Sequence, residues 1–226
     1  MAEYEIDGLT LHVPGHMLND RIAGKLVSGG YEAHEARAVR MRVKPGQRVL
    51  ELGAGLGYVS AVAARTSGPE NVVSVEANPA LLPVIERNLK LNGFAKLRLM
   101  HGAVVGQTQD IEDLGFDPKK AFWAGRIADD TSNPEDIVSV PVLALPKLLE
   151  EFKSQVVIMD VEGAERFLFD AAWPEHVLTV IMELHPKQYP DTVIKQIVDC
   201  MSTSGLTYDP GPSRGRILCF RRVRGI

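Results

Sequence analysis

The chain has 226 residues, 45% of them hydrophobic and 24% charged, and a formal net charge of −4. This length suits one sizeable α/β domain and is short for two. Acidic and basic residues are interspersed, so no basic face indicates nucleic-acid binding. The first residues are acidic rather than basic, and no apolar run is long enough to span a bilayer. We therefore expect a cytoplasmic protein with neither a nucleic-acid nor a membrane partner.

The N-terminal fifth of the chain differs from the rest. Residues 1–45 are predicted to form irregular structure followed by a helix, packed on the core of the main domain, which spans residues 46–226. Residues 32–41 have a helix-forming composition, and the Lys44-Pro45-Gly46 sequence ends that helix before the first strand of the main domain.

The first strand of the main domain leads into a glycine-rich turn. Residues 49–57 read VLELGAGLG, an apolar run followed by glycines at 53, 55 and 57. Glycines let the backbone turn tightly and admit a ligand close to the main chain. The next strand, 71–76, ends on Glu76, whose carboxylate could accept hydrogen bonds from both hydroxyls of a ribose. The pair predicts an adenosine-containing ligand.

The glycine spacing helps to separate two nucleoside cofactors. The dinucleotide fingerprint is G-x-G-x-x-G, whereas this loop reads G-x-G-x-G and has Tyr58 at the position of the third glycine. Glu51 precedes the loop; its carboxylate would repel a pyrophosphate but attract an ammonium group. S-adenosylmethionine has an ammonium group and no phosphate. We therefore predict S-adenosylmethionine as cofactor and S-adenosylhomocysteine as product, with NAD or a ligand-free turn as alternatives.

The pattern of strands and helices predicts the fold class. Strands at 48–52, 71–76 and 97–100 alternate with helices, which makes half of a doubly wound fold. After them come strands at 156–160 and 177–183, helices at 145–152, 165–172 and 191–201, and a hairpin within 206–221. We predict a three-layer, doubly wound α/β fold with a mostly parallel sheet that ends in an antiparallel hairpin, the class I methyltransferase fold.

An insertion at about 104–140 interrupts the alternation. It is polar and acidic for much of its length and contains the aromatic pair Phe122-Trp123. Long loops of this kind either cover a substrate or decorate the fold, and both interpretations stay open.

Several separate blocks resemble the FkbM family of S-adenosylmethionine-dependent methyltransferases. They occur in the family's order between about residues 20 and 186 and read GGYE at 29–32, VLELGAGLG at 49–57, VEANP at 75–79, DVEGAE at 160–165 and ELHP at 183–186. The resemblance implies methyl transfer to a hydroxyl of a small molecule, without specifying the acceptor. Glu51 replaces the Asp of many members, and 107–134 follows no pattern of the family.

These considerations predict a cofactor site. Its residues are Tyr31, Glu51, Gly53, Ala54, Gly55, Gly57, Glu76, Ala77, Gly102, Ala103 and Asp160. Gly102 and Ala103 follow the third strand, where small residues leave room for adenine. For Tyr31 the functional role rests on the resemblance, and an aromatic anchor of the N-terminal segment is the alternative.

Three side chains are candidates for catalysis. Asp160, Glu183 and His185 follow the fourth and fifth strands, so they should border the methyl donor. His185, with a near-neutral pKa, could remove the acceptor proton, and Glu183 could orient it. A helix-capping role for Asp160 and a turn role for His185 are the alternatives. The three could hold a divalent metal, but their spacing does not demand one and none is predicted.

The sequence thus predicts an S-adenosylmethionine-dependent methyltransferase that acts on a hydroxyl of a small molecule or sugar, with an amine as the less favoured alternative. An RNA or protein methyltransferase on the same fold is one alternative. A nucleoside-binding protein that has lost the chemistry is another, because fold alone does not fix function.

Overall fold

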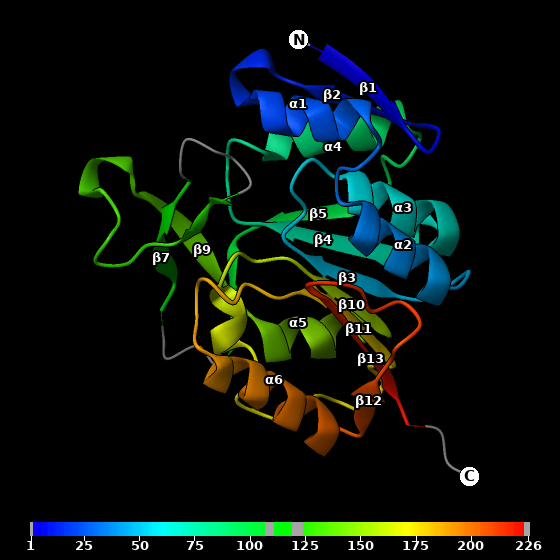
Figure 1. Ribbon diagram of the computed structural model, residues 1–226, viewed down its shortest axis with the longest axis vertical. Coiled ribbons are helices and arrows are strands. Elements are labelled where there is room, and N and C mark those ends of the chain that lie inside the picture. Colours follow the sequence, from blue (N-terminus) through cyan, green and yellow to red (C-terminus); the bar gives the residue numbers. More distant parts are fainter. Residues whose placement is uncertain (1, 107–110, 119–123, 224–226) are drawn as a thin grey trace.

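The computed structural model of the protein describes residues 2–106, 111–118 and 124–223 (Figure 1). The helices, in chain order, are α1 (Asp20–Val27), α2 (Ala33–Arg42), α3 (Tyr58–Ser67), α4 (Leu82–Leu91), α5 (Leu145–Phe152) and α6 (Asp191–Thr203), with short 3-10 turns that include η5 (Ala164–Phe167). The strands are β1 (Ala2–Ile6), β2 (Leu9–Val13), β3 (Val49–Leu52), β4 (Val72–Glu76), β5 (Arg98–His101), β6 (Ala103–Val105), β7 (Asp113–Asp117), β8 (Arg126–Ile127), β9 (Val138–Ala144), β10 (Val156–Met159), β11 (Thr179–Glu183), β12 (Leu206–Tyr208) and β13 (Ile217–Arg222).

Within these residues the central sheet has the order β12-β13-β11-β10-β3-β4-β5. Strands β3, β4, β5, β10 and β11 run parallel, and β13 lies antiparallel between β11 and β12. The predicted fold class is therefore confirmed, including the antiparallel hairpin at the end of the sheet. No helix in the described part of the chain is long and apolar enough to cross a membrane.

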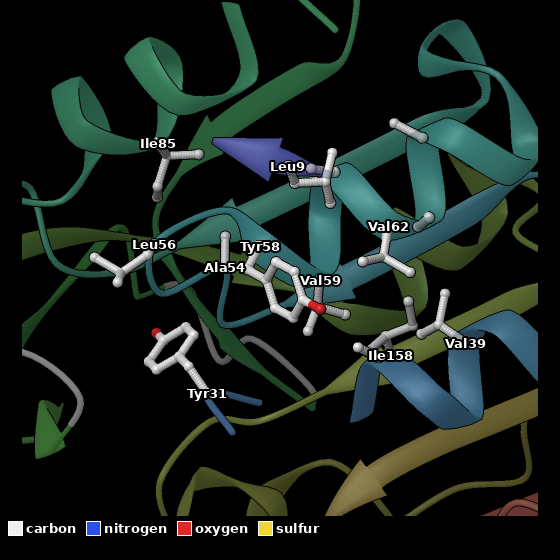
Figure 2. Packing of buried hydrophobic residues seen from close by; sticks show 14 of the residues in the cluster. Leu9, Tyr31, Val39, Ala54, Leu56, Tyr58, Val59, Val62, Ile85 and Ile158 are labelled. Carbon is white, nitrogen blue, oxygen red and sulfur yellow. The ribbon is translucent and has the colours of Figure 1, made fainter. Parts of the chain in front are cut away.

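Alternation along the strands gives the sheet two apolar faces. Val49 and Ile158 face α2, α3 and α4, whereas Leu50, Leu52 and Met159 face α5 and α6 (Figure 1). A parallel sheet buried on both faces needs such near-continuous apolar strands. Figure 2 shows the first of these cores, in which Tyr58 at the start of α3 is 1% exposed. Tyr58 thus occupies the third-glycine position by turning its ring into the core.

Residues 2–13 form a hairpin, β1 and β2, where the sequence predicts irregular structure. Asp7 and Gly8, both with positive φ, make the turn; Asp-Gly is a strong signal for a two-residue hairpin. The hairpin is attached to α4, because Asn88 Oδ1 accepts the His12 N–H at 2.8 Å and Asn92 Oδ1 accepts the Thr10 N–H at 2.9 Å. The expectation of irregular structure overlooked both the turn and the alternating strand.

The insertion folds into part of a second, smaller sheet of order β6-β9-β7-β8. It contains β7 and β8, and β9 continues four residues beyond the predicted end at about 140. Phe116 and Val140 form a small core with Ala103, which fastens the insertion to the carboxyl edge of the main sheet. The aromatic pair at 122–123 lies outside the described residues.

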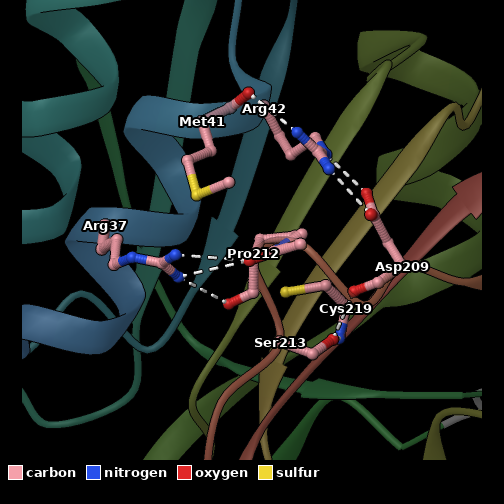
Figure 3. Close-up of polar contacts among 8 residues, drawn as sticks. Arg37, Met41, Arg42, Asp209, Pro212, Ser213 and Cys219 are labelled. Atoms are coloured by element: carbon pink, nitrogen blue, oxygen red, sulfur yellow. Dashed lines mark hydrogen bonds and ion pairs between the residues drawn. The ribbon is translucent and has the colours of Figure 1, made fainter.

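An ion pair attaches α2 to the loop between β12 and β13 (Figure 3). Arg42 Nε donates to Asp209 Oδ2 at 2.5 Å and Arg42 Nη2 donates to Asp209 Oδ1 at 2.7 Å. The Asp209 side chain is only 3% exposed, so its charge depends on this bidentate partner. The hydrogen bond from Arg42 is the main cause that lowers the pKa of Asp209.

We expect Arg42→Ala to lower the free energy of unfolding at pH 7 by about 1–3 kcal/mol, because it leaves a buried carboxylate without its partner. The folded-state pKa of Asp209 is lowered, so this contribution is present above the unfolded pKa of about 3.9 and is lost as pH falls through the folded value. Denaturant titrations of both proteins between pH 7 and 3 should therefore converge.

The matched control is Lys195→Ala, since Lys195 pairs with Asp199 on the exposed face of α6. That pair should contribute less than about 0.5 kcal/mol. Equal losses of unfolding free energy in Arg42→Ala and Lys195→Ala would show that the Arg42–Asp209 pair contributes no more than a surface ion pair.

Candidate active site

The strand register brings the ends of three strands together. Leu52 of β3 pairs with Val75 of β4 on one side and Met159 of β10 on the other. Gly53 N–H donates to the Val75 carbonyl, and Asp160 N–H donates to the Leu52 carbonyl, both at 2.9 Å. The residues that follow these pairs, Gly53, Glu76 and Asp160, therefore lie at one carboxyl edge, as the sequence predicts.

Two glycines of the loop are required by its geometry. Gly53 has φ +86°, and a Cβ there would lie 1.8 Å from the Asp160 carbonyl oxygen, so no other residue fits. Gly55 has φ +55°, and its N–H donates to Glu76 Oε2 at 3.0 Å. The glycine loop and the acid of the next strand are thus joined directly.

Glu76 is 7% exposed and is held by backbone donors. Besides the Gly55 N–H, the Asn78 N–H donates to Glu76 Oε1 at 2.8 Å. Burial raises the pKa of Glu76, and these backbone hydrogen bonds oppose the rise. The carboxylate is therefore fixed at the tip of β4, where a ribose could donate to its remaining lone pairs.

A cavity of about 750 Å³, counted with the solvent at its mouth, lies over this edge. Eight predicted cofactor residues line it: Tyr31, Gly53, Gly55, Glu76, Ala77, Gly102, Ala103 and Asp160. The insertion also lines this cavity, with Phe116, Gly125, Arg126 and Ile127. The insertion is therefore part of the site, and Phe116 was missed because nothing in the sequence shows where an insertion folds back.

Three predicted cofactor residues, Glu51, Ala54 and Gly57, do not line this cavity. Glu51 points toward α3, because strand alternation puts it on the face opposite Leu50 and Leu52. Its Oε2 accepts hydrogen bonds from Ser60 and, at 2.5 Å, from Ser74. Burial raises the Glu51 pKa to about 7. A contact between Glu51 and a ligand ammonium group stays a prediction, and no direct route for it lies in the cavity described.

His185 lies among three carboxylates and is 4% exposed. Its Nδ1 donates to Glu165 Oε1 at 3.0 Å, and its Nε2 lies 3.4 Å from both Asp160 Oδ1 and Glu162 Oε2. Burial lowers its pKa, but the carboxylates, Glu165 foremost, outweigh burial and raise the pKa to about 9. The near-neutral pKa expected from the sequence did not take these neighbours into account, and the role of His185 as a base stays a prediction. If protonated, His185 would hold the carboxylates in place and would have no free lone pair to accept a proton.

Glu165 is the side chain whose role the sequence analysis missed. It was expected in the first turn of a helix over 165–172, but only the 3-10 turn η5 forms there and Glu165 is fully buried. Its Oε2 accepts the Gly163 N–H at 2.8 Å, which folds the 160–165 block around His185. Glu162 and Gly163 both have positive φ in this turn. The glycine in the DVEGAE sequence is therefore the signal for the turn, because glycine adopts positive φ readily.

Glu183 lies apart from the first cavity. It ends β11 and forms an ion pair with Arg216 instead of orienting His185. Within the described residues, two triads could hold a cation, Asp160-Glu162-His185 and Glu35-Asp160-Glu183, each with ligand atoms within 4.8 Å of one another. A cation in the first triad would compete with the proton on His185. The expectation of no metal stays a prediction.

Comparisons with known proteins match this part of the chain. A family model described as the TRM5/TYW2 methyltransferase domain matches residues 25–118, which contain the glycine loop and Glu76. A curated relative, protein-L-isoaspartate O-methyltransferase 1 of Archaeoglobus fulgidus, is 41% identical over 81 residues. That match covers 35% of this chain and 34% of the relative. These matches indicate a methyltransferase domain of the S-adenosylmethionine-dependent class. The finer assignment to the FkbM family stays a prediction.

Three solved structures are similar to this chain at low sequence identity. TYW2 of M. jannaschii in complex with AdoMet is 16% identical, with a TM-score of 0.46 over 98% of this chain and 86% of its own. Trm5b of Pyrococcus abyssi is 14% identical, with a TM-score of 0.49 over 97% of this chain and 55% of its own. Precorrin-6y C5,15-methyltransferase of Geobacter metallireducens is 12% identical, with a TM-score of 0.47 over 93% and 91%. The fold assignment rests on the strand order itself.

We expect Glu51→Gln to change how stability depends on pH. The folded-state pKa of Glu51 is raised from 4.5 to about 7, so folding takes up a proton between these values and wild-type stability falls as pH rises through that window. Glu51→Gln removes this fall. Between pH 4.5 and 7.5 its free energy of unfolding should rise relative to wild type by up to about 3 kcal/mol. The exposed control Glu86→Gln should differ from wild type in free energy of unfolding by the same amount at every pH. The same result for Glu51→Gln would contradict the raised pKa of Glu51.

The charge of His185 can be measured directly. Nuclear magnetic resonance of the imidazole during a pH titration should give a pKa near 9 in the wild type. Glu165→Gln should lower that pKa, because Glu165 contributes the largest upward shift. Glu175→Gln, at an exposed acid elsewhere, is the matched control and should leave the titration unchanged. A wild-type imidazole that titrates near 6.5 would restore His185 as a candidate base.

Proposed function

We propose that the protein is an S-adenosylmethionine-dependent methyltransferase that methylates a hydroxyl of a small molecule. The observation that carries this proposal is the hydrogen bond from the Gly55 N–H to Glu76, because it joins the glycine loop to a carboxylate that could accept hydrogen bonds from a ribose in the same cavity. The match of residues 25–118 to a methyltransferase-domain family supports it independently.

Methyl transfer needs alignment of nucleophile, methyl and sulfur more than covalent help from the enzyme, because the sulfonium is already a good leaving group. An alcohol also needs a base for its proton. Asp160 suits this role: it lines the cavity, and within the described residues its Oδ1 accepts no hydrogen bond and has His185 Nε2 as an ion-pair partner at 3.4 Å. Burial holds the pKa of Asp160 well above its usual range, although His185 lowers it. His185 and Glu165 then act as positioning residues.

One rival is methylation of RNA. The family model that matches residues 25–118 is the TRM5/TYW2 methyltransferase domain, whose description names no small-molecule acceptor. The residues around the site argue for a small acceptor instead. Glu32, Asp160 and Glu162 line the cavity, and this concentration of carboxylates would repel a phosphate backbone.

Calorimetric titration with S-adenosylmethionine, S-adenosylhomocysteine and NAD tests the proposal. We expect the first two ligands to bind and NAD not to bind. Glu76→Ala should weaken S-adenosylmethionine binding by about 1–3 kcal/mol, since hydrogen bonds between ribose hydroxyls and a charged group are lost. Glu70→Ala, at a solvent-facing acid away from the cavity, is the control. NAD binding alone, or full affinity in Glu76→Ala, would overturn the cofactor assignment.

A further inference from the structure

A second cavity adjoins the first. It measures about 830 Å³, again counted with the solvent at its mouth, and is bounded by α1, the start of α2, the residues that follow β10, the last residue of β11 and the start of β13. The two cavities share four lining residues, Tyr31, Glu32, Asp160 and Glu162. Such an arrangement suits methyl transfer, because donor and acceptor must be held in line and meet at one point.

The shared wall lies against the glycine loop. A Cβ on Gly55 would lie 3.1 Å from Glu32 Oε1 and 3.2 Å from the Tyr31 hydroxyl. Glu32 has φ +45°, a left-handed conformation that is costly for a residue with a side chain. Such strained residues often mark functional sites. The conformation turns Glu32 toward the loop, so the junction of the cavities lies beside the expected cofactor.

Charge is distributed unevenly in the second cavity. The junction is acidic, with Glu32, Asp160 and Glu162 on the shared wall, and Glu35 and Glu183 also line the chamber. Arg21 and Lys25 line it from α1; they are one helical turn apart, exposed, and in no ion pair within the described part of the chain. Arg216 also lines this cavity, but Glu183 already neutralises it. The chamber thus joins a pair of uncompensated cations to an acidic junction.

We infer that the second cavity is the acceptor site and that the acceptor is a small molecule with an anionic group, carboxylate or phosphate, which Arg21 and Lys25 bind. This inference rests on the proposed function. The acceptor's hydroxyl lies at the junction and its anionic group lies away from the junction carboxylates, which would repel it. A neutral acceptor would leave the two α1 cations unused.

The transfer is balanced without a further reactant. The hydroxyl proton passes to the Asp160 carboxylate, and the oxygen lone pair forms the new bond to the methyl carbon. The carbon–sulfur bond breaks, and its electron pair neutralises the sulfonium to give the thioether of S-adenosylhomocysteine. The products are the methyl ether and a protonated Asp160, which returns its proton to water.

The anion subsite can be tested before the acceptor is identified. Protein saturated with S-adenosylhomocysteine is titrated calorimetrically with inorganic phosphate and, in a parallel arm, with acetate, which separates phosphate from carboxylate recognition. At least one anion should bind, and the double variant Arg21→Gln/Lys25→Gln should bind it about tenfold more weakly. The control Arg87→Gln/Lys90→Gln removes two exposed cations of α4 that line neither cavity and should bind like wild type.

Absence of binding of both anions to wild type, or equal affinity in the Arg21→Gln/Lys25→Gln variant, would overturn the inference. The affinity for S-adenosylhomocysteine tests the proposed function separately, and it should be equal in the wild type and both double variants. A labelling assay adds the link to the acceptor: labelled S-adenosylmethionine is incubated with a small-molecule extract, and products are separated on an anion-exchange resin. Label retained by the resin supports an anionic acceptor, and label confined to the flow-through contradicts it.

Discussion

The close approach of the Gly53 backbone to the Asp160 carbonyl is the constraint on which the site depends. A Cβ at residue 53 would lie 1.8 Å from that oxygen, so the ends of β3 and β10 lie this close only because Gly53 lacks one. The same approach puts Asp160 beside the glycine loop, while the Gly55 N–H binds Glu76 on the other side. One glycine thus fixes the spacing between the expected donor and the candidate base.

The second constraint is charge. Three carboxylates lie where the two cavities meet and two more line the second cavity, and burial raises the pKa of Glu32, Asp160, Glu162 and Glu183. His185 offsets part of this, because its cation lowers the pKa of Asp160 and Glu162. A sulfonium cofactor would offset more, since its positive charge would enter an acidic chamber. The site is therefore built to favour a cation before any acceptor binds.

The sequence predicts the features that depend on neighbouring residues and misses those that depend on residues distant in the chain. The glycine loop, Glu76 and the strand order rest on local patterns, and the structure has each where it was predicted. Glu51 is also local, but which face of β3 it occupies depends on the helix that packs there. The protonation of His185 depends on Glu165, twenty residues away, whose burial follows from a tight turn where a helix was expected. The contribution of the insertion to the first cavity depends on where the insertion packs against the main sheet, and no local sequence pattern encodes that position.

The N-terminal segment links stability to the site. Its hairpin is bound to α4 by Asn88 and Asn92, and α2 is bound to the far end of the sheet by the Arg42–Asp209 pair. Tyr31 and Glu32 lie between these two attachments, at the point where α1 leads into α2. The positive φ of Glu32 is unfavourable in isolation, so the attachments on either side must hold it. The N-terminal segment, part of which the sequence predicts to be irregular, therefore contributes Tyr31 and Glu32 to the wall between the two cavities.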